Sequence, residues 1–133
     1  MKLSRTLAVL SLSAALAACA PTPIRSATYV LRPEQTVELA HGVSLTYDSF
    51  SDSRCPPNAR CVWAGRLMFR FVLHGPDGAE EFTLGPDQPQ TAPPALKGAR
   101  IVLDPGAIPA ARGGAGGARP GDVLPVTLQV LPR

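Results

Sequence analysis

The stretch Leu67–Leu84 reads LMFRFVLHGPDGAEEFTL, and it predicts a β-hairpin. Every second residue from Leu67 to Leu73 is large and apolar, which is the pattern of a strand with one buried face. The run Gly75-Pro76-Asp77-Gly78 supplies turn residues, and a second strand is expected over Glu80–Leu84. The stretch therefore predicts two antiparallel strands joined by a tight turn.

The sequence on both sides of this hairpin carries more short alternating segments, and none of them keeps helical periodicity for three turns. Phe50 falls on the opposite parity to Tyr47, so a bulge or bend near Ser49 is expected if Phe50 also points inward. Pro125 has no amide donor, so the last strand is expected to lie at a sheet edge or to point this residue away from its neighbour. The predicted strands are Tyr29–Arg32, Thr36–Ala40, Val43–Tyr47, Leu67–His74, Glu80–Leu84, Arg100–Asp104 and Val123–Leu131.

The composition agrees with a small turn-rich domain. The chain has 133 residues, of which 45% are hydrophobic, with 15 prolines and 12 glycines, and these values exclude a disordered chain and a protein of long helices. Pro86–Lys97 and Gly106–Gly121 are predicted to be irregular surface connections. With about six to eight short strands, the chain is predicted to be all-β, a small antiparallel β-sandwich or barrel-like domain.

Residues 1–18 have the features of a secretory signal. Lys2 and Arg5 precede the apolar segment Leu7–Leu16, which is too short to span a membrane. The sequence that follows, Leu16-Ala17-Ala18-Cys19, resembles the lipobox of bacterial lipoproteins. The resemblance implies cleavage before Cys19, a diacylglyceryl group on its sulfur and further acylation of the new amine, for example by palmitate. The alternative is an ordinary cleaved signal that leaves a spare thiol.

Lipidation at Cys19 would leave a mature chain made of a short tether and one domain. Residues 19–27 form a short tether, and residues 28–133 form a single domain. Ala20, in place of an aspartate, resembles the sorting signal for the outer membrane, which implies the periplasmic face of that membrane in a Gram-negative cell. The membrane is therefore the first expected partner, reached through the N-terminal lipid.

Removal of the signal also changes the charge. Without Lys2 and Arg5, the 13 cationic residues fall to 11 against 10 acidic ones, a net charge of about +1. The remaining arginines are scattered and form no run. This distribution is typical of solvated surfaces, and no nucleic-acid partner is expected.

The segment from Asp52 to Gly65 reads DSRCPPNARCVWAG and contains Cys55 and Cys61. With Cys19 lipidated, these are the remaining thiols of an exported chain, so a disulfide is predicted. A ring of this size is worth about 2 kcal/mol. Their spacing differs from that of CxxC redox and zinc motifs, so neither a metal nor another cofactor is expected.

Trp63 shares strand parity with Cys61 and Phe69. Its ring is therefore expected to point inward against the disulfide, provided that no bulge intervenes at Gly65. The alternative is an exposed Trp63 that stacks on a sugar or an aromatic ligand. Three arginines would flank such a site: Arg54, Arg60 and Arg66.

The two halves of this motif, Asp52–Pro56 and Cys61–Gly65, resemble a signature of small secreted bacterial proteins and lipoproteins. The similarity extends over Leu31–Leu84 and reaches the final strand. It implies an exported protein and carries no implication about mechanism. The chain departs from the pattern at Gly113–Gly117, a glycine-rich insertion before the last strand.

No catalytic constellation is recognised, and the protein is not expected to be an enzyme. The chain has two histidines, His41 and His74, both expected at exposed turns and neither beside a nucleophile motif. The leading hypothesis is a non-catalytic envelope lipoprotein that binds an envelope protein or contributes to envelope structure through the Cys55–Gly65 loop. The candidate binding residues are Arg54, Arg60, Trp63 and Arg66.

The alternative hypothesis is a small ligand carrier or hydrolase. It would use a pocket between the two sheets, lined by Trp63, Tyr47 and Arg66.

Overall fold

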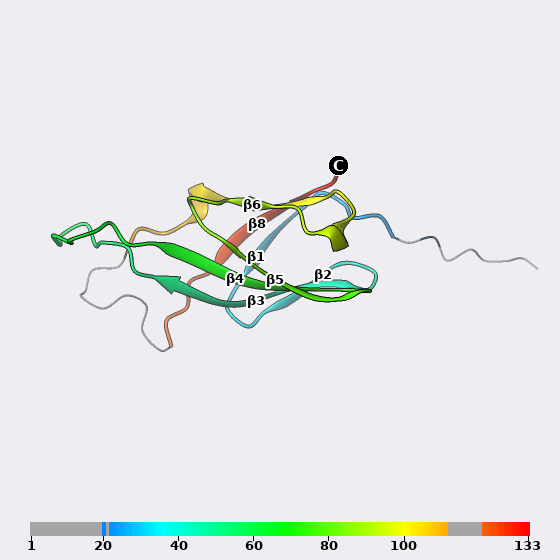
Figure 1. Ribbon diagram of the computed structural model, residues 1–133, viewed down its shortest axis with the longest axis horizontal. Coiled ribbons are helices and arrows are strands. Elements are labelled where there is room, and N and C mark those ends of the chain that lie inside the picture. Colours follow the sequence, from blue (N-terminus) through cyan, green and yellow to red (C-terminus); the bar gives the residue numbers. More distant parts are fainter. Residues whose placement is uncertain (1–19, 21, 112–120) are drawn as a thin grey trace, which may run out of the picture.

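A computed structural model describes residue 20, residues 22–111 and residues 121–133, and in these ranges the chain forms two four-stranded antiparallel sheets (Figure 1). One sheet has the order β1–β8–β7–β6 and contains β1 (Ala27–Leu31), β8 (Val126–Leu131), β7 (Arg100–Leu103) and β6 (Gln90–Thr91). The other has the order β2–β3–β4–β5 and contains β2 (Thr36–Ala40), β3 (Val43–Asp52), β4 (Leu67–Gly75) and β5 (Gly78–Leu84). The predicted all-β antiparallel sandwich is confirmed. The predicted signal at residues 1–18, Cys19 and the Gly113–Gly117 insertion lie outside the described residues.

The core lies between the sheets and is built from the inward faces of both. The apolar face of β4 is fully buried, as its alternation predicts. Tyr47 on β3 packs edge-on against Phe69, with ring centroids 5.9 Å apart. Its hydroxyl donates a 2.9 Å hydrogen bond to the carbonyl of Leu124, just before β8, and burial raises the pKa of this hydroxyl. This bond connects the two sheets through the middle of the core.

The pairing of β3 with β4 contains the predicted bulge. Tyr47 pairs with Phe71, and the next pair is Ser49 with Arg70, so Asp48 is the extra residue. The extra residue resets the alternation of the strand. Phe50 is consequently half-buried against the core, as the change of parity predicts.

In the other sheet, the edge alternative for the last strand is wrong, and so is the prediction that residues 86–97 are irregular. The last strand, β8, lies between β1 and β7 and not at an edge. This is possible because β8 begins at Val126, after Pro125, so no hydrogen bond between strands requires an amide donor from the proline. Residues 86–97, predicted to be irregular, include β6 and the helical turn η1 (Pro94–Leu96), because Gln90–Thr91 pairs with β7 and Leu96 packs into the core.

The helical segments of the described ranges are η1 and a second turn, η2 (Pro105–Ala107). Neither of them is long and apolar enough to cross a membrane.

The sandwich has two different ends, which β3 and β4 connect. At one end Ser44 pairs with His74, and the chain turns directly from β4 into β5. Figure 1 shows the described start of the chain, in blue, and the C-terminus at this end. At the other end Asp52 pairs with Leu67, and residues 53–66 project outward as a long loop, in green. We call residues 53–66 the arm.

Candidate functional site

The arm continues the antiparallel pairing of β3 and β4 past the end of the sandwich. The amide of Ser53 donates to the carbonyl of Arg66 at 2.9 Å, and the amide of Cys55 donates to the carbonyl of Ala64 at 3.0 Å. The Ser53 hydroxyl accepts a further 2.9 Å bond from the Arg66 amide. No residue of the arm belongs to the core cluster of the described residues. The arm is thus held by its own hydrogen bonds and not by packing against a second sheet.

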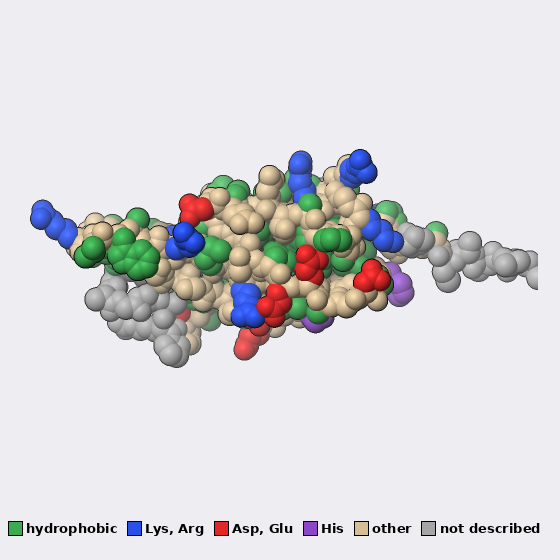
Figure 2. All heavy atoms as spheres, in the orientation of Figure 1, with side chains coloured by type: hydrophobic (Ala, Val, Ile, Leu, Met, Phe, Trp, Pro, Cys, Tyr) green, Lys and Arg blue, Asp and Glu red, His purple; other side chains and the backbone are tan. Residues whose placement is uncertain are grey.

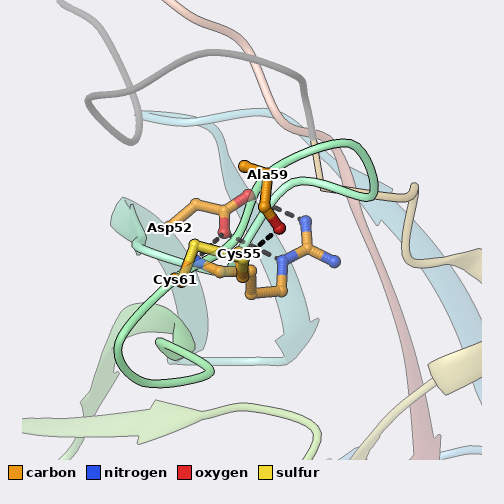
Figure 3. Close-up of a disulfide and its surroundings, with 5 residues drawn as sticks. Asp52, Cys55, Ala59 and Cys61 are labelled. Carbon is orange, nitrogen blue, oxygen red and sulfur yellow. Dashed lines mark hydrogen bonds and ion pairs between the residues drawn. A yellow bond between two sulfur atoms is a disulfide. The ribbon is translucent and has the colours of Figure 1, made fainter.

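The tip of the arm is closed by the predicted disulfide, which is confirmed. Cys55 and Cys61 are bonded, with their Cα atoms 5.9 Å apart, a normal separation for a disulfide (Figure 3). Inside the ring, the amide of Ala59 donates to the carbonyl of Pro56 at 3.1 Å, which closes a β-turn with Pro57 at its second position. The proline and the covalent ring both limit the conformations open to the tip.

The base of the arm is fixed by an ion pair between Asp52 and Arg54. The Arg54 Nε and Nη2 atoms donate to the two carboxylate oxygens of Asp52 at 2.8 and 2.7 Å. The Nη1 atom donates to the carbonyl of Pro109 at 2.9 Å, which connects the arm to the chain after η2. The hydrogen bond from Arg54 lowers the pKa of the Asp52 carboxyl, and the same bond raises the pKa of Arg54. Arg54 is therefore engaged within the protein and is not a free binding residue.

Trp63 points into solvent, and the prediction that it packs inward against the disulfide is wrong. Its side chain is 74% exposed, and that of Val62 is fully exposed. One cause is the position of the arm beyond the sandwich, where no second sheet covers either face. The other cause is Gly65, whose φ of +71° interrupts the strand alternation from β4 into the arm. A Cβ at this position would lie 1.8 Å from the carbonyl oxygen of Ser53, so glycine is required. The glycine was the signal in the sequence for this outcome.

Two cations accompany the apolar tip. Arg60 and Arg66 are both exposed, and neither guanidinium forms an ion pair or hydrogen bond with any residue that the structure describes. Figure 2 shows hydrophobic side chains, in green, and Lys or Arg side chains, in blue, on the projecting end of the molecule where the arm lies. The arm therefore presents two large apolar side chains and two free positive charges.

An open depression lies beside Trp63, and it differs from the pocket that the sequence predicts. Tyr47 takes no part in it, because its ring is in the core and its hydroxyl is bonded to Leu124. The lining holds hydroxyls and a guanidinium but no histidine or carboxylate. His41 and His74, which are exposed as predicted, are not part of it. The lining residues are Ser51, Ser53, Trp63, Ala64, Gly65, Arg66 and Met68.

The described ranges also contain no group of three or more His, Cys, Asp or Glu side chains placed to hold a metal ion. Chemically, the arm offers apolar surface, cations and hydroxyls. Groups of these kinds can contact a ligand or the surface of another protein.

The fold and the arm together define a small antiparallel β-sandwich with a projecting, disulfide-closed arm. Comparison of the chain with protein-family models, with curated proteins and with solved structures gave no match.

Proposed function

We propose that the protein is a non-catalytic lipoprotein of the bacterial envelope whose arm binds a protein partner. The observation that carries the proposal is the exposure of Val62 and Trp63, directly after the disulfide-closed tip of the arm. Solvent-exposed tryptophan is uncommon on a surface with no partner, and Trp and Arg are the residues most enriched among those that dominate binding energy.

The construction of the arm supports the same proposal. Ordering a loop on binding costs free energy, and a loop that is ordered in advance avoids part of this cost. The Cys55–Cys61 ring, Pro57 and the Asp52–Arg54 pair all restrict the arm before any partner is present. The free guanidinium groups of Arg60 and Arg66 favour a partner whose apolar site has an acidic rim.

The lipobox supports the location. Cys19 would carry the lipid, most naturally at the periplasmic face of the outer membrane in a Gram-negative cell, as Ala20 after the cysteine implies. The alternative of a small-ligand carrier is favoured by one observation, the depression that joins Trp63 to Arg66 and two serine hydroxyls. Because its lining has no acid or base, hydrolysis is not proposed for it.

Photocrosslinking in cells tests the proposal. A benzophenone amino acid is placed at Val62 in the full chain, and at Val30 as a matched control, because Val30 is also an exposed valine, at 64%, but lies on β1. We expect an adduct of one discrete mass from position 62 and none of that mass from position 30. Trp63→Ala should weaken the affinity for the partner about 30-fold and should therefore reduce the yield of the adduct.

Three results would count against the proposal. An adduct of the same mass from position 30 would show contact without specificity, and an adduct that persists in Trp63→Ala would exclude the arm as the binding element. Absence of any protein adduct, with saturable binding of a small ligand that Trp63→Ala abolishes, would favour the carrier. In the same cells, Cys19→Ala should move the protein to the soluble fraction, and continued membrane association would contradict lipid anchoring.

A further inference from the structure

The end of the sandwich opposite the arm carries a groove of about 590 Å³. We call it the tether groove, because Thr22, Pro23 and Ile24 form one wall and Ile24 also packs against the core. The β2–β3 turn, the β4–β5 turn, η1 and the C-terminal residues form the rest. Its lining residues are Thr22, Pro23, Ile24, Ala40, His41, Gly42, Val43, Pro76, Ala95, Leu96, Lys97, Ala99, Pro132 and Arg133.

The lining of the tether groove is apolar with a basic rim. Most of its residues are aliphatic or proline. Its lysine and arginine residues are Lys97 and Arg133, and it includes no aspartate or glutamate. Neither Lys97 nor Arg133 forms an ion pair with any residue that the structure describes. The acidic residue next in sequence to the lining is Asp77, which lies on the exposed β4–β5 turn. The groove thus combines apolar surface with two cationic side chains that form no ion pair among the described residues.

The turn that carries Lys97 also contacts the Arg133 side chain. The amide of Lys97 donates to the carbonyl of Pro94 at 3.0 Å, which fixes the turn after η1. The next residue, Gly98, has a φ of +99°, and the aliphatic stem of Arg133 lies across it, so that an added Cβ would come within 3.2 Å of the Arg133 Cδ atom. Gly98 therefore allows the Arg133 side chain to lie against the turn that carries Lys97.

The short tether between Cys19 and the groove would keep the groove close to a lipid on Cys19. Thr22 is the third residue after Cys19, and three fully extended Cα–Cα steps span at most about 11 Å. A lipid on Cys19 would therefore place the groove within about 11 Å of its own attachment point. Domains on so short a tether cannot turn their attached end away from the bilayer.

We propose that the tether groove docks on the surface of an anionic phospholipid bilayer. Lys97 and Arg133 contact the lipid phosphates, and the apolar lining faces the boundary between headgroups and acyl chains. This inference rests on the lipid anchoring proposed above. It also fixes the orientation of the arm: β3 spans ten residues, about 30 Å, from the groove to the base of the arm, so docking directs Trp63 away from the membrane.

Vesicle binding by a chain of residues 20–133, which lacks both the signal segment and the lipidated cysteine, tests the groove without its lipid. The vesicles contain phosphatidylglycerol and phosphatidylethanolamine, with pure phosphatidylcholine vesicles as the uncharged reference. Lys97→Gln and Arg133→Gln should each weaken sedimentation with the anionic vesicles about 5-fold, and together about 25-fold. The matched control is the Arg60→Gln, Arg66→Gln double variant, which removes the same charge from the arm and should leave binding unchanged. Equal loss in both double variants, or equal binding to both kinds of vesicle, would overturn the proposal.

The single tryptophan of the chain tests the orientation of the lipidated protein in vesicles. Headgroup-labelled quencher lipids should leave Trp63 fluorescence unchanged and should quench a reporter placed in the groove by His41→Trp in a Trp63→Phe background. Quenching of Trp63 itself would overturn the proposed orientation. Lipid anchoring is read separately, from the fractionation of Cys19→Ala cells. If the unlipidated chain does not bind anionic vesicles, while fractionation shows that Cys19 anchors the protein, the groove proposal is wrong and the anchoring proposal stands.

Discussion

Phe69 and Trp63 lie six residues apart and share strand parity in the sequence, yet their surroundings in the structure are opposite. Phe69 on β4 is fully buried between two sheets, whereas Trp63 on the arm is 74% exposed. Phe69 lies within the paired strand β4, whereas Trp63 lies in a bend of the arm, just beyond the pair formed by Cys55 and Ala64. The difference shows that sequence parity alone does not bury a side chain: the strand must continue without interruption, and a second sheet must cover its face.

The same contrast extends to what holds each region together. The body of the sandwich is stabilised by a continuous apolar core, with the Tyr47 hydroxyl bond to Leu124 inside it. The arm has no core, and it depends on a disulfide, an ion pair and a short ladder. Body and arm should therefore respond to different substitutions.

The largest expected effect compares aromatic residues of the two regions. Phe71→Ala should reduce the free energy of unfolding by about 3–5 kcal/mol, because a fully buried ring is replaced by a cavity. Trp63→Ala should change it by less than about 0.5 kcal/mol, as is usual for an exposed position without structural contacts. Urea denaturation followed by circular dichroism measures both. A loss of several kcal/mol in Trp63→Ala would mean that the arm is part of the core after all.

The sequence could predict the body of this protein well and the arm only in part. Residues such as Phe71 and Leu128 are found from alternation, because each strand of the body is covered by a second sheet. The disulfide is found from the predicted export signal and the number of thiols. Gly65 was the one local signal for the exposure of Trp63; the absence of a covering sheet could not be inferred, because the length of that sheet is set by pairings distant in sequence, such as β1 with β8.

The same limit explains the other differences. The two-residue strand β6 exists only through its pairing with β7, and its own sequence contains no periodic signal. Arg54 was found as a cation near Trp63, but its partners Asp52 and Pro109 are brought to it by the fold. The tether groove joins segments from both ends of the chain, so no local pattern indicates it.

An intermediate effect compares two glycines with the same backbone conformation. Gly65 and Gly42 have φ values of +71° and +74°, but an added Cβ meets the Ser53 carbonyl at Gly65 and open space at Gly42. Gly42→Ala should therefore show only the cost of the left-handed conformation, about 1–2 kcal/mol. Gly65→Ala must also break the base of the arm. It should abolish the protection of the Ser53 and Cys55 amides from hydrogen exchange and leave that of the β3 and β4 amides intact.

Equal effects of the two alanines would contradict this distinction. The exchange of individual amides, measured by NMR, separates local opening of the arm from global unfolding of the body. If Gly65→Ala instead unfolded both regions together, the arm and the sandwich would form a single cooperative unit.

The smallest expected effect concerns the ion pair at the base of the arm. Asp52→Asn removes a charged partner of Arg54, a change worth about 1 kcal/mol for a pair of this kind at pH 6. Because the pKa of Asp52 is lower in the folded protein than its ordinary value of 3.8, the ionised carboxylate stabilises the fold. This stabilisation is complete above the unfolded pKa and is lost as the pH falls through the folded pKa. The difference in the free energy of unfolding between wild type and Asp52→Asn should therefore be largest near pH 6 and shrink below pH 3.8.

Urea denaturation across this pH range measures the difference. Asp48→Asn at pH 6 is the control, because the Asp48 pair with Arg70 is longer, at 3.7 Å, and about half exposed. A difference that does not shrink in acid would show that Asp52 acts through its shape and neutral hydrogen bonds and not through its charge.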